Sequence, residues 1–148
     1  MEWSNEYQAY YNDVVKRRLS KKFIKIYEKN CALHDRYLRS FYFANTGSKL
    51  LTYSKKGLST IQIQLDTEFD SEDILLMYKN VRMLMINHDE TENVSFCALT
   101  GIGSCLVSQF AVFEDGSIKH EMEFEGGTIA ILCEDVQIKI LHNHYWKN

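Results

Sequence analysis

The chain of 148 residues contains no proline and no uninterrupted apolar run of membrane-spanning length. The missing apolar run excludes a transmembrane helix, which needs about 20 consecutive apolar residues. The amino-terminal residues are acidic and aromatic, and they lack the basic-then-apolar order of a secretory signal. Without such a signal, we expect a reducing, cytoplasmic environment. We find no repeat, linker or low-complexity segment, so we expect a single domain spanning 1–148. The four cysteines (Cys31, Cys97, Cys105 and Cys133) are then predicted to be buried free thiols rather than a disulfide framework.

Motifs that carry common enzyme chemistry are also missing. There is no Gly-x-Ser-x-Gly element of a serine hydrolase. Gly101-Ile102-Gly103 lacks a third glycine and is not followed by the Lys-Ser or Lys-Thr of a phosphate loop, so we interpret it as a turn. His142-Asn143-His144 could bind a metal weakly if both histidines shared a strand face, but a solvated tail is favoured. We therefore predict no bound cofactor.

Two His-Asp pairs, His34-Asp35 and His88-Asp89, invite comparison with metal-dependent HD phosphohydrolases. In those enzymes a helical bundle holds the ligands, whereas both pairs here fall at the borders of expected strands. No further set of metal ligands is spaced around them, and two-residue matches are common by chance. A metal hydrolase using His34, Asp35 and His88 is therefore rejected, and we predict that the protein is not an enzyme.

Charge is distributed unevenly, although the formal net charge is only −3. Residues 1–60 hold twelve Lys and Arg against five Asp and Glu, whereas residues 61–148 hold five against fifteen. Such an imbalance predicts one basic and one acidic surface, unless the fold mixes the two halves in space.

Residues 5–29 have the periodicity of one long amphipathic helix. Apolar side chains recur at spacings of three and four residues, at Tyr7, Tyr11, Val14, Val15, Leu19, Phe23, Ile26 and Tyr27. Ser4 or Asn5 can cap its start, and we expect it to end at Asn30. Its later turns could offer nucleic acid a basic surface, formed by Lys16, Arg17, Arg18, Lys21, Lys22 and Lys25. The favoured alternative is that the aromatic stripe packs on a sheet and the lysines are solvated.

After residue 33 the periodicity becomes strand-like. Strands are expected over 37–43, 49–54, 58–65, 94–99 and 105–113, and the apolar residues of 58–65 should share one buried face. Residues 74–86 form either a short helix and a strand or two strands, and we favour two strands. The predicted fold class is α+β. One long amino-terminal helix (1–30) packs on a curled or two-layer, mostly antiparallel sheet of about eight strands (31–141), followed by a tail (142–148).

The strongest hairpin signal lies in residues 117–141, where Gly126-Gly127 separates two alternating apolar runs. If these glycines form a two-residue loop, His120 lies opposite Cys133. A His–Cys contact could be a nucleophile and its base. Because the neighbouring residues on that face are apolar, we favour a buried histidine with one hydrogen bond.

The other face of the same strand is acidic. Glu121, Glu123 and Glu125 would point one way, and Glu114 and Asp115 occupy the preceding turn. Aligned like charges repel modestly, so such a row is tolerated where it is solvated or meets a cationic partner. We interpret these five residues as candidate partner-binding residues, and an ordinary solvated face is the alternative.

Three segments carry a resemblance: Leu33-His34-Asp35, Tyr78-Lys79-Asn80-Val81, and His120-Glu121-Met122-Glu123-Phe124 with Gly127 and the Ile-x-Ile run that follows it. Their order resembles a loose group of small, mostly uncharacterised bacterial domains, some of which look like immunity proteins of polymorphic toxin systems. This resemblance implies a binding role and brings no catalytic residues. The leading hypothesis is a non-enzymatic protein-binding domain that inhibits a cationic protein through its acidic face. The alternative is a nucleic-acid-associated module that uses the basic helix.

Overall fold

The computed structural model describes residues 3–45, 59–66, 72–88 and 102–142. The predicted strands 49–54 and 94–99 lie outside the described residues. So do Asp89, Cys97, Gly101, Asn143 and His144.

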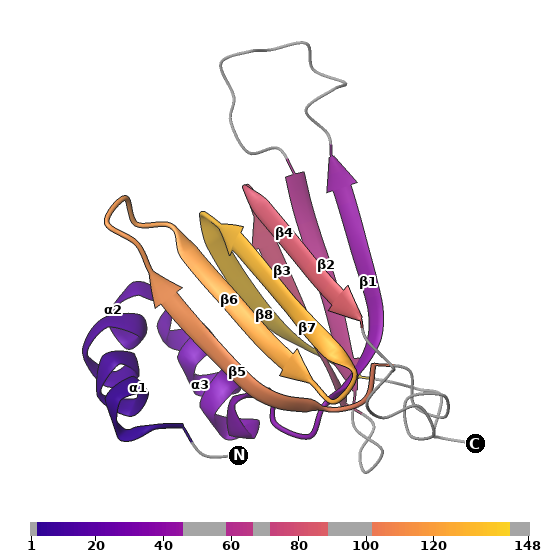
Figure 1. The fold of residues 1–148 in the computed structure, drawn as a ribbon, viewed down its shortest axis with the longest axis horizontal. Helices are drawn as coiled ribbons and strands as arrows, with labels where there is room; N and C mark the ends of the chain where they lie inside the picture. Colours follow the sequence, from indigo (N-terminus) through magenta and orange to yellow (C-terminus); the bar gives the residue numbers. More distant parts are fainter. Residues whose placement is uncertain (1–2, 46–58, 67–71, 89–101, 143–148) are drawn as a thin grey trace.

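A helical layer comes first in the chain and is followed by the strands (Figure 1). The helical segments are α1 (Asn5–Tyr10), the π-helical η1 (Tyr11–Val15), α2 (Lys16–Arg18), α3 (Lys21–Lys29) and the 3-10 turn η2 (Cys31–Leu33). The described strands are β1 (Tyr37–Asn45), β2 (Ser59–Asp66), β3 (Glu72–Lys79), β4 (Met83–His88), β5 (Cys105–Val112), β6 (Ile118–Phe124), β7 (Gly127–Cys133) and β8 (Asp135–His142). The predicted α+β class is confirmed.

The prediction of one long helix over 5–29 is wrong, because the chain leaves the helical conformation at Leu19 and Ser20. Both residues have extended backbone, with ψ near 154°. Ser20 then starts α3, since its Oγ accepts a hydrogen bond from the Phe23 N–H at 3.0 Å. Serine competes well with helix continuation because its hydroxyl satisfies one of the free N–H groups of a new first turn. The break also places the Leu19 side chain in the core.

The strands form two antiparallel sheets. Sheet A has the order β1-β2-β3-β8, and sheet B has the order β4-β7-β6-β5. Figure 1 shows sheet B in front of sheet A, with the helices gathered at the side where β5 and β8 lie. The two-layer alternative of the prediction is therefore correct and the curled sheet is wrong. Residues 74–86 contribute to two strands, as favoured, but these strands belong to different sheets.

A bent two-stranded ribbon belongs to both sheets, because β3 continues into β4 and β7 continues into β8. Lys79 pairs with Asp135 at the end of sheet A, and three residues of bend separate Lys79 from Met83 at the start of β4. Asn80 in this bend has a φ of 55°, which asparagine tolerates better than most residues. The N–H of Glu134 donates to the Lys79 carbonyl at 3.1 Å and holds the two bends together.

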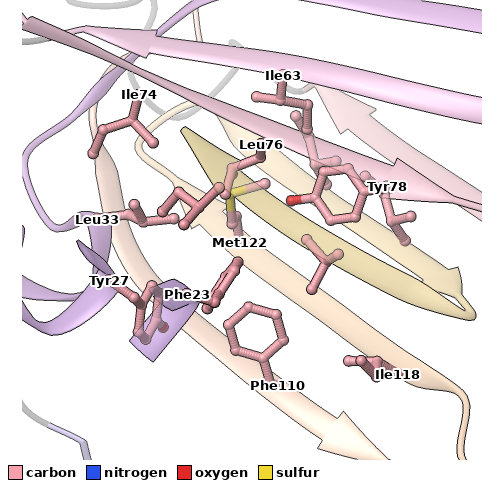
Figure 2. Packing of buried hydrophobic residues seen from close by; sticks show 14 of the residues in the cluster. Phe23, Tyr27, Leu33, Ile63, Ile74, Leu76, Tyr78, Phe110, Ile118 and Met122 are labelled. Atoms are coloured by element: carbon pink, nitrogen blue, oxygen red, sulfur yellow. The ribbon is translucent and has the colours of Figure 1, made fainter. Parts of the chain in front are cut away.

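The hydrophobic core lies between the sheets and is closed at one side by α3. Ile61 and Ile63 of β2 are fully buried, as their alternation predicted. Figure 2 shows Phe23 and Tyr27 of α3 beside Phe110 of β5, and the ring centroids of Phe23 and Phe110 lie 5.5 Å apart. The aromatic stripe of the helical layer thus completes the core between the open edges of β5 and β8.

Amino-terminal tyrosines also bind the backbone of β5, which is an edge strand of sheet B. The Phe110 N–H donates to Tyr7 Oη at 2.7 Å, and the Val112 N–H donates to Tyr10 Oη at 2.8 Å. An edge strand otherwise leaves such groups unpaired and available to other chains. Burial raises the pKa of Tyr7 to about 12, which keeps its hydroxyl neutral.

Candidate functional site

Sheet B has an outer face that no described helix or strand covers (Figure 1). Because antiparallel partners share a face, the register places side chains from β4, β7, β6 and β5 in rows across this surface. The rows are Met83–Leu132–Lys119–Ala111, Met85–Ala130–Glu121–Gln109 and Asn87–Thr128–Glu123–Val107. We call this surface, defined by these three rows, the sheet B outer face. It combines apolar and acidic side chains with one basic side chain, Lys119.

Two of the predicted partner-binding residues, Glu121 and Glu123, lie on the sheet B outer face and are exposed. Their neighbours His120, Met122 and Phe124 are buried on the inner face, as strand alternation predicted. The Glu121 carboxylate lies 3.5 Å from Lys119 Nζ on its own strand. Glu123 makes no ion pair or hydrogen bond with any described residue, so its charge is available to a partner.

Glu125 does not belong to this row, because the predicted register is wrong by two residues. Phe124 pairs with Gly127, so Glu125 and Gly126 form the turn and His120 lies opposite Ile131 instead of Cys133. The Glu125 carboxylate accepts hydrogen bonds from the N–H and the hydroxyl of Ser104, at 2.9 and 2.5 Å. It therefore fixes the hairpin end against the start of β5.

The two acidic residues of the β5–β6 turn have different roles. Glu114 is exposed. Asp115 accepts hydrogen bonds from the N–H and hydroxyl of Ser117, at 2.9 and 2.6 Å, and forms an ion pair with Arg82 at 2.8 Å. These Ser117 hydrogen bonds, and then Arg82, hold the pKa of Asp115 well below its usual value. Asp115 thus organises its own turn, and only Glu114 remains as a candidate partner-binding residue there.

The sheet B outer face also carries apolar side chains that we did not single out in the sequence. Met85 is 61% exposed on β4, which is the other edge strand of the described sheet B. Its row neighbours are Ala130 and Glu121, so an apolar contact site adjoins the carboxylates. Methionine is flexible and polarizable, which suits it to irregular partner surfaces.

A buried polar network lies on the inner face of the same sheet. His120 Nδ1 is 2.6 Å from Tyr78 Oη, and His120 Nε2 is 2.7 Å from Ser108 Oγ. The Tyr27 hydroxyl lies 2.8 Å from the same Ser108 Oγ. Because Tyr78 Oη has no other hydrogen-bond partner among the described residues, we infer that it donates to Nδ1 and that Nε2–H donates to Ser108.

Burial controls the protonation of this network. It lowers the pKa of His120 to about 3, so the imidazole is neutral. It also raises the pKa values of Tyr27 and Tyr78 well above the ordinary tyrosine value. Ser108 and His120 have the atoms of a nucleophile and its base, but every side chain of the network is fully buried. We interpret the network as a core element, as expected for His120, although it has two hydrogen bonds rather than one.

The predicted basic surface is divided by the fold. Arg18 is committed to the protein backbone, because its Nε donates to the Gly116 carbonyl at 2.8 Å and its guanidinium also contacts the Glu134 carbonyl. Lys16 Nζ lies 3.2 Å from the Glu28 carboxylate. The remaining members, Arg17, Lys21, Lys22 and Lys25, are exposed.

The histidine and cysteine candidates are scattered over the fold. His34 Nδ1 lies 3.1 Å from the Asp35 carboxylate in the turn before β1, whereas His88 ends β4. The described residues contain no group of three or more His, Cys, Asp or Glu side chains that could hold a metal ion. Cys105 and Cys133 are buried free thiols, as predicted.

Cys31 is also a free thiol but is exposed, contrary to the prediction. It begins a turn in which Cys31, Ala32 and Leu33 have φ values of 54°, 51° and 68°. This left-handed turn buries Ala32 and Leu33 and leaves Cys31 at the surface. Non-glycine residues adopt this conformation only at a cost in energy, so periodicity alone does not reveal the turn.

No protein-family model and no curated protein sequence matches this chain. Within the part of the chain that the structure describes, no helix is both long enough and apolar enough to cross a membrane.

The exposure of Met85 could not be predicted from the sequence. Residues 81–86 are mostly apolar, and we favoured a strand there as part of 74–86. Met85 and Ile86 are 61% and 51% exposed, because among the described strands β4 pairs only with β7. Whether a strand lies at an edge depends on the order of strands in the sheet, which local periodicity does not encode.

Proposed function

We propose that this protein is a non-enzymatic protein-binding domain that uses the sheet B outer face to bind a cationic protein, in the manner of an immunity-like inhibitor. The observation that carries the proposal is the exposed Met85 in the same row as Glu121, with Glu123 in the next row, on a face that no described element covers. Apolar side chains supply contact area to such an interface, and carboxylates steer association and select the partner. Glu114 extends the negative charge to the neighbouring turn.

The internal contacts of two other acidic residues support a narrower surface than the sequence predicts. Asp115 and Glu125 are already bound to Ser117, Arg82 and Ser104, so a partner would have to displace those contacts. The proposed binding residues are therefore Glu121, Glu123, Glu114 and Met85.

The test begins with a photo-crosslinking amino acid at position 85, which identifies the protein in contact with the sheet B outer face. Association of the purified partner is then measured by stopped flow at low salt. We expect Glu121→Lys with Glu123→Lys to lower the association rate by about tenfold or more, because steering depends on these charges. We expect Met85→Ser mainly to raise the dissociation rate.

The matched control is Glu6→Lys with Asp13→Lys, which makes the same charge change at exposed positions of the helical layer. This control should change the association rate much less, and circular dichroism should show that both double variants are folded. Equal association rates for the wild type and the Glu121/Glu123 variant would disprove the proposal, and so would equal losses in the two double variants.

A further inference from the structure

A groove runs between α3 and β8. It consists of two adjacent cavities of about 290 and 240 Å³, and Lys22 borders both. Lys25 and Lys29 line the larger cavity, and Lys139 of β8 lines the smaller one. We call this feature, defined by these four residues, the lysine groove.

Helix geometry explains why three of these lysines face the groove. Positions 22, 25 and 29 have spacings of three and four residues and lie on one stripe of α3. The opposite stripe carries Phe23 and Tyr27 into the core, so the lysine stripe is left beside β8. None of the four lysines forms an ion pair or hydrogen bond with a described residue.

The acidic residue of α3 does not neutralise the lysine groove, because it binds other residues. Glu28 is the only acidic residue of α3, and it binds Lys16 Nζ at 3.2 Å and the Tyr11 hydroxyl at 2.8 Å. Glu72 lines one end of the groove, so positive charge exceeds negative charge among the lining residues. Like charges on one helical stripe destabilise the helix modestly, and an anionic ligand would remove that repulsion.

The floor of the groove is apolar. Ile26 and Ile140 line the larger cavity and are partly buried, and Ile138 lies beneath the smaller cavity. The smaller cavity also adjoins Ser20, at the amino-terminal and therefore positive end of α3. The groove thus offers cations at its rim and an apolar base between them.

We propose that the lysine groove binds an acidic peptide segment of a second protein. Its Asp or Glu carboxylates pair with the lysines, and an apolar side chain between them covers Ile26 and Ile140. Nucleic acid fits less well, because Phe23, the one aromatic residue among the described residues that line the groove, is 1% exposed and offers no surface for base stacking. This site is separate from the sheet B outer face, which would repel the same ligand.

Fluorescence anisotropy with the full chain tests the proposal. The probe is a fluorescein-labelled peptide of Glu-Glu-Leu repeats, and the control peptide has Gln-Gln-Leu repeats. We expect saturable binding of the acidic peptide only, weakening as salt is raised. Lys22→Gln with Lys25→Gln should lower the affinity about fivefold or more, since two surface ion contacts are lost.

The control variant is Arg17→Gln with Lys21→Gln, which removes two exposed charges outside the groove and should bind nearly as the wild type does. Glutamine has a helix propensity close to that of lysine, so both variants should fold. Lys29→Gln with Lys139→Gln gives an independent test of the same groove.

Three results would overturn the proposal: no saturable binding, equal binding of the glutamine peptide, or equal losses in the groove and control variants. Tighter binding of an oligothymidylate that shows the same Lys22/Lys25 sensitivity would assign the groove to nucleic acid instead. Glu121→Lys with Glu123→Lys should leave peptide affinity undiminished, so failure here and failure of the proposed function are distinguishable.

Discussion

In the core, the His120 ring stacks on Phe110 with centroids 4.0 Å apart and hydrogen-bonds Tyr78 and Ser108 through its two nitrogens. With a single proton on the ring, both nitrogens are satisfied, because Nδ1 accepts from Tyr78 and Nε2–H donates to Ser108. A second proton would place a charge in a fully buried site and oppose the hydrogen bond from Tyr78.

We predict that this arrangement makes stability depend on pH in the range of histidine titration. The pKa of His120 is about 3 in the folded protein, below the unfolded value of about 6.5. The folded state thus binds fewer protons, so stability present above pH 6.5 is lost as pH falls toward 3. Between pH 7 and pH 5 the free energy of unfolding should fall by about 2 kcal/mol, measured by urea denaturation.

His120→Gln is the matched variant, because an amide keeps one donor and one acceptor but does not titrate. It should be less stable at pH 7 and should lose most of the decline between pH 7 and pH 5. The carboxylates of Asp115 and Glu134 also have lowered pKa values. Because they titrate below pH 5, they contribute little to the change in stability between pH 7 and pH 5. An unchanged slope in His120→Gln would contradict the assignment.

At single residues, strand alternation predicted correctly that Glu121 and Glu123 point outward and His120 inward. The predicted register was wrong because we placed Gly127 in the turn, whereas it is the first residue of β7 and pairs with Phe124. A Cβ at Gly127 would lie 2.0 Å from the Asn87 carbonyl oxygen, so glycine is needed there for the close approach of β4. The turn rule uses the hairpin alone and does not include that neighbouring strand.

Among the elements, the contact of the helical layer with β5 is more than apolar packing. Tyr7 and Tyr10 accept hydrogen bonds from two N–H groups on the free edge of the strand. The tyrosines thereby do for β5 what an added strand would do, and they leave its edge unavailable for pairing with another chain.

We predict that Tyr7→Phe and Tyr10→Phe each lower the free energy of unfolding by about 1 kcal/mol, because each loses one hydrogen bond but keeps its ring. Amide hydrogen exchange should accelerate at Phe110 in the first variant and at Val112 in the second. Tyr42→Phe is the control, since Tyr42 is 62% exposed on β1. Equal stability of all three variants would mean that water replaces the tyrosines at no cost.

Element types were largely predictable and element boundaries were less so. The alternation in β2 and the spacing of the aromatic stripe in the helical layer predicted these elements correctly, because the apolar side chains at those positions are buried. The break at Leu19 was missed because the apolar spacing continues across it. Ser20 was the available signal, as the amino-terminal cap of α3, but a single serine does not outweigh about seven turns of regular apolar spacing over 5–29.

At the scale of the whole molecule, the uneven charge of the sequence becomes two separate surfaces. The sheet B outer face carries Glu121 and Glu123, and the lysine groove carries cations from α3 and β8. Arg18 and Asp115 are removed from these surfaces by contacts within the protein. The sequence left open whether the fold separates or mixes the charges of its two halves: Glu121 and Glu123 lie apart from the lysine groove, whereas Arg82 pairs with Asp115 and Lys119 lies 3.5 Å from Glu121.

We predict that the two surfaces act independently, because they share no residue and no hydrogen-bond network. Lys22→Gln with Lys25→Gln should weaken only the acidic peptide, and Glu121→Lys with Glu123→Lys should slow only the crosslinked partner. The quadruple variant should show the sum of both effects on a logarithmic scale, measured by anisotropy and stopped flow. Loss of partner association in the groove variant would instead indicate one continuous interface.

The order of the strands could not be predicted, because pairing between distant segments is not recorded in local periodicity. This is why sheet A and sheet B, and with them the exposure of Met85, emerge only from the structure. The proposed binding surface was therefore predictable only in part. The outward direction of Glu121 and Glu123 follows from strand alternation, whereas the exposure of Met85 depends on the order of strands in sheet B.

The bent ribbon constrains the route by which the chain folds. Lys79 pairs with Asp135, fifty-six positions later, whereas the β5-β6 and β6-β7 pairings join near neighbours in sequence. Closing so long a loop costs entropy before any contact compensates for it. We expect the local hairpins to form first and the ribbon to close late, in one event that builds both sheets and encloses the core. Folding should therefore be slow for a protein of this size, and the edges of β3 and β7 are exposed to mispairing until the ribbon closes.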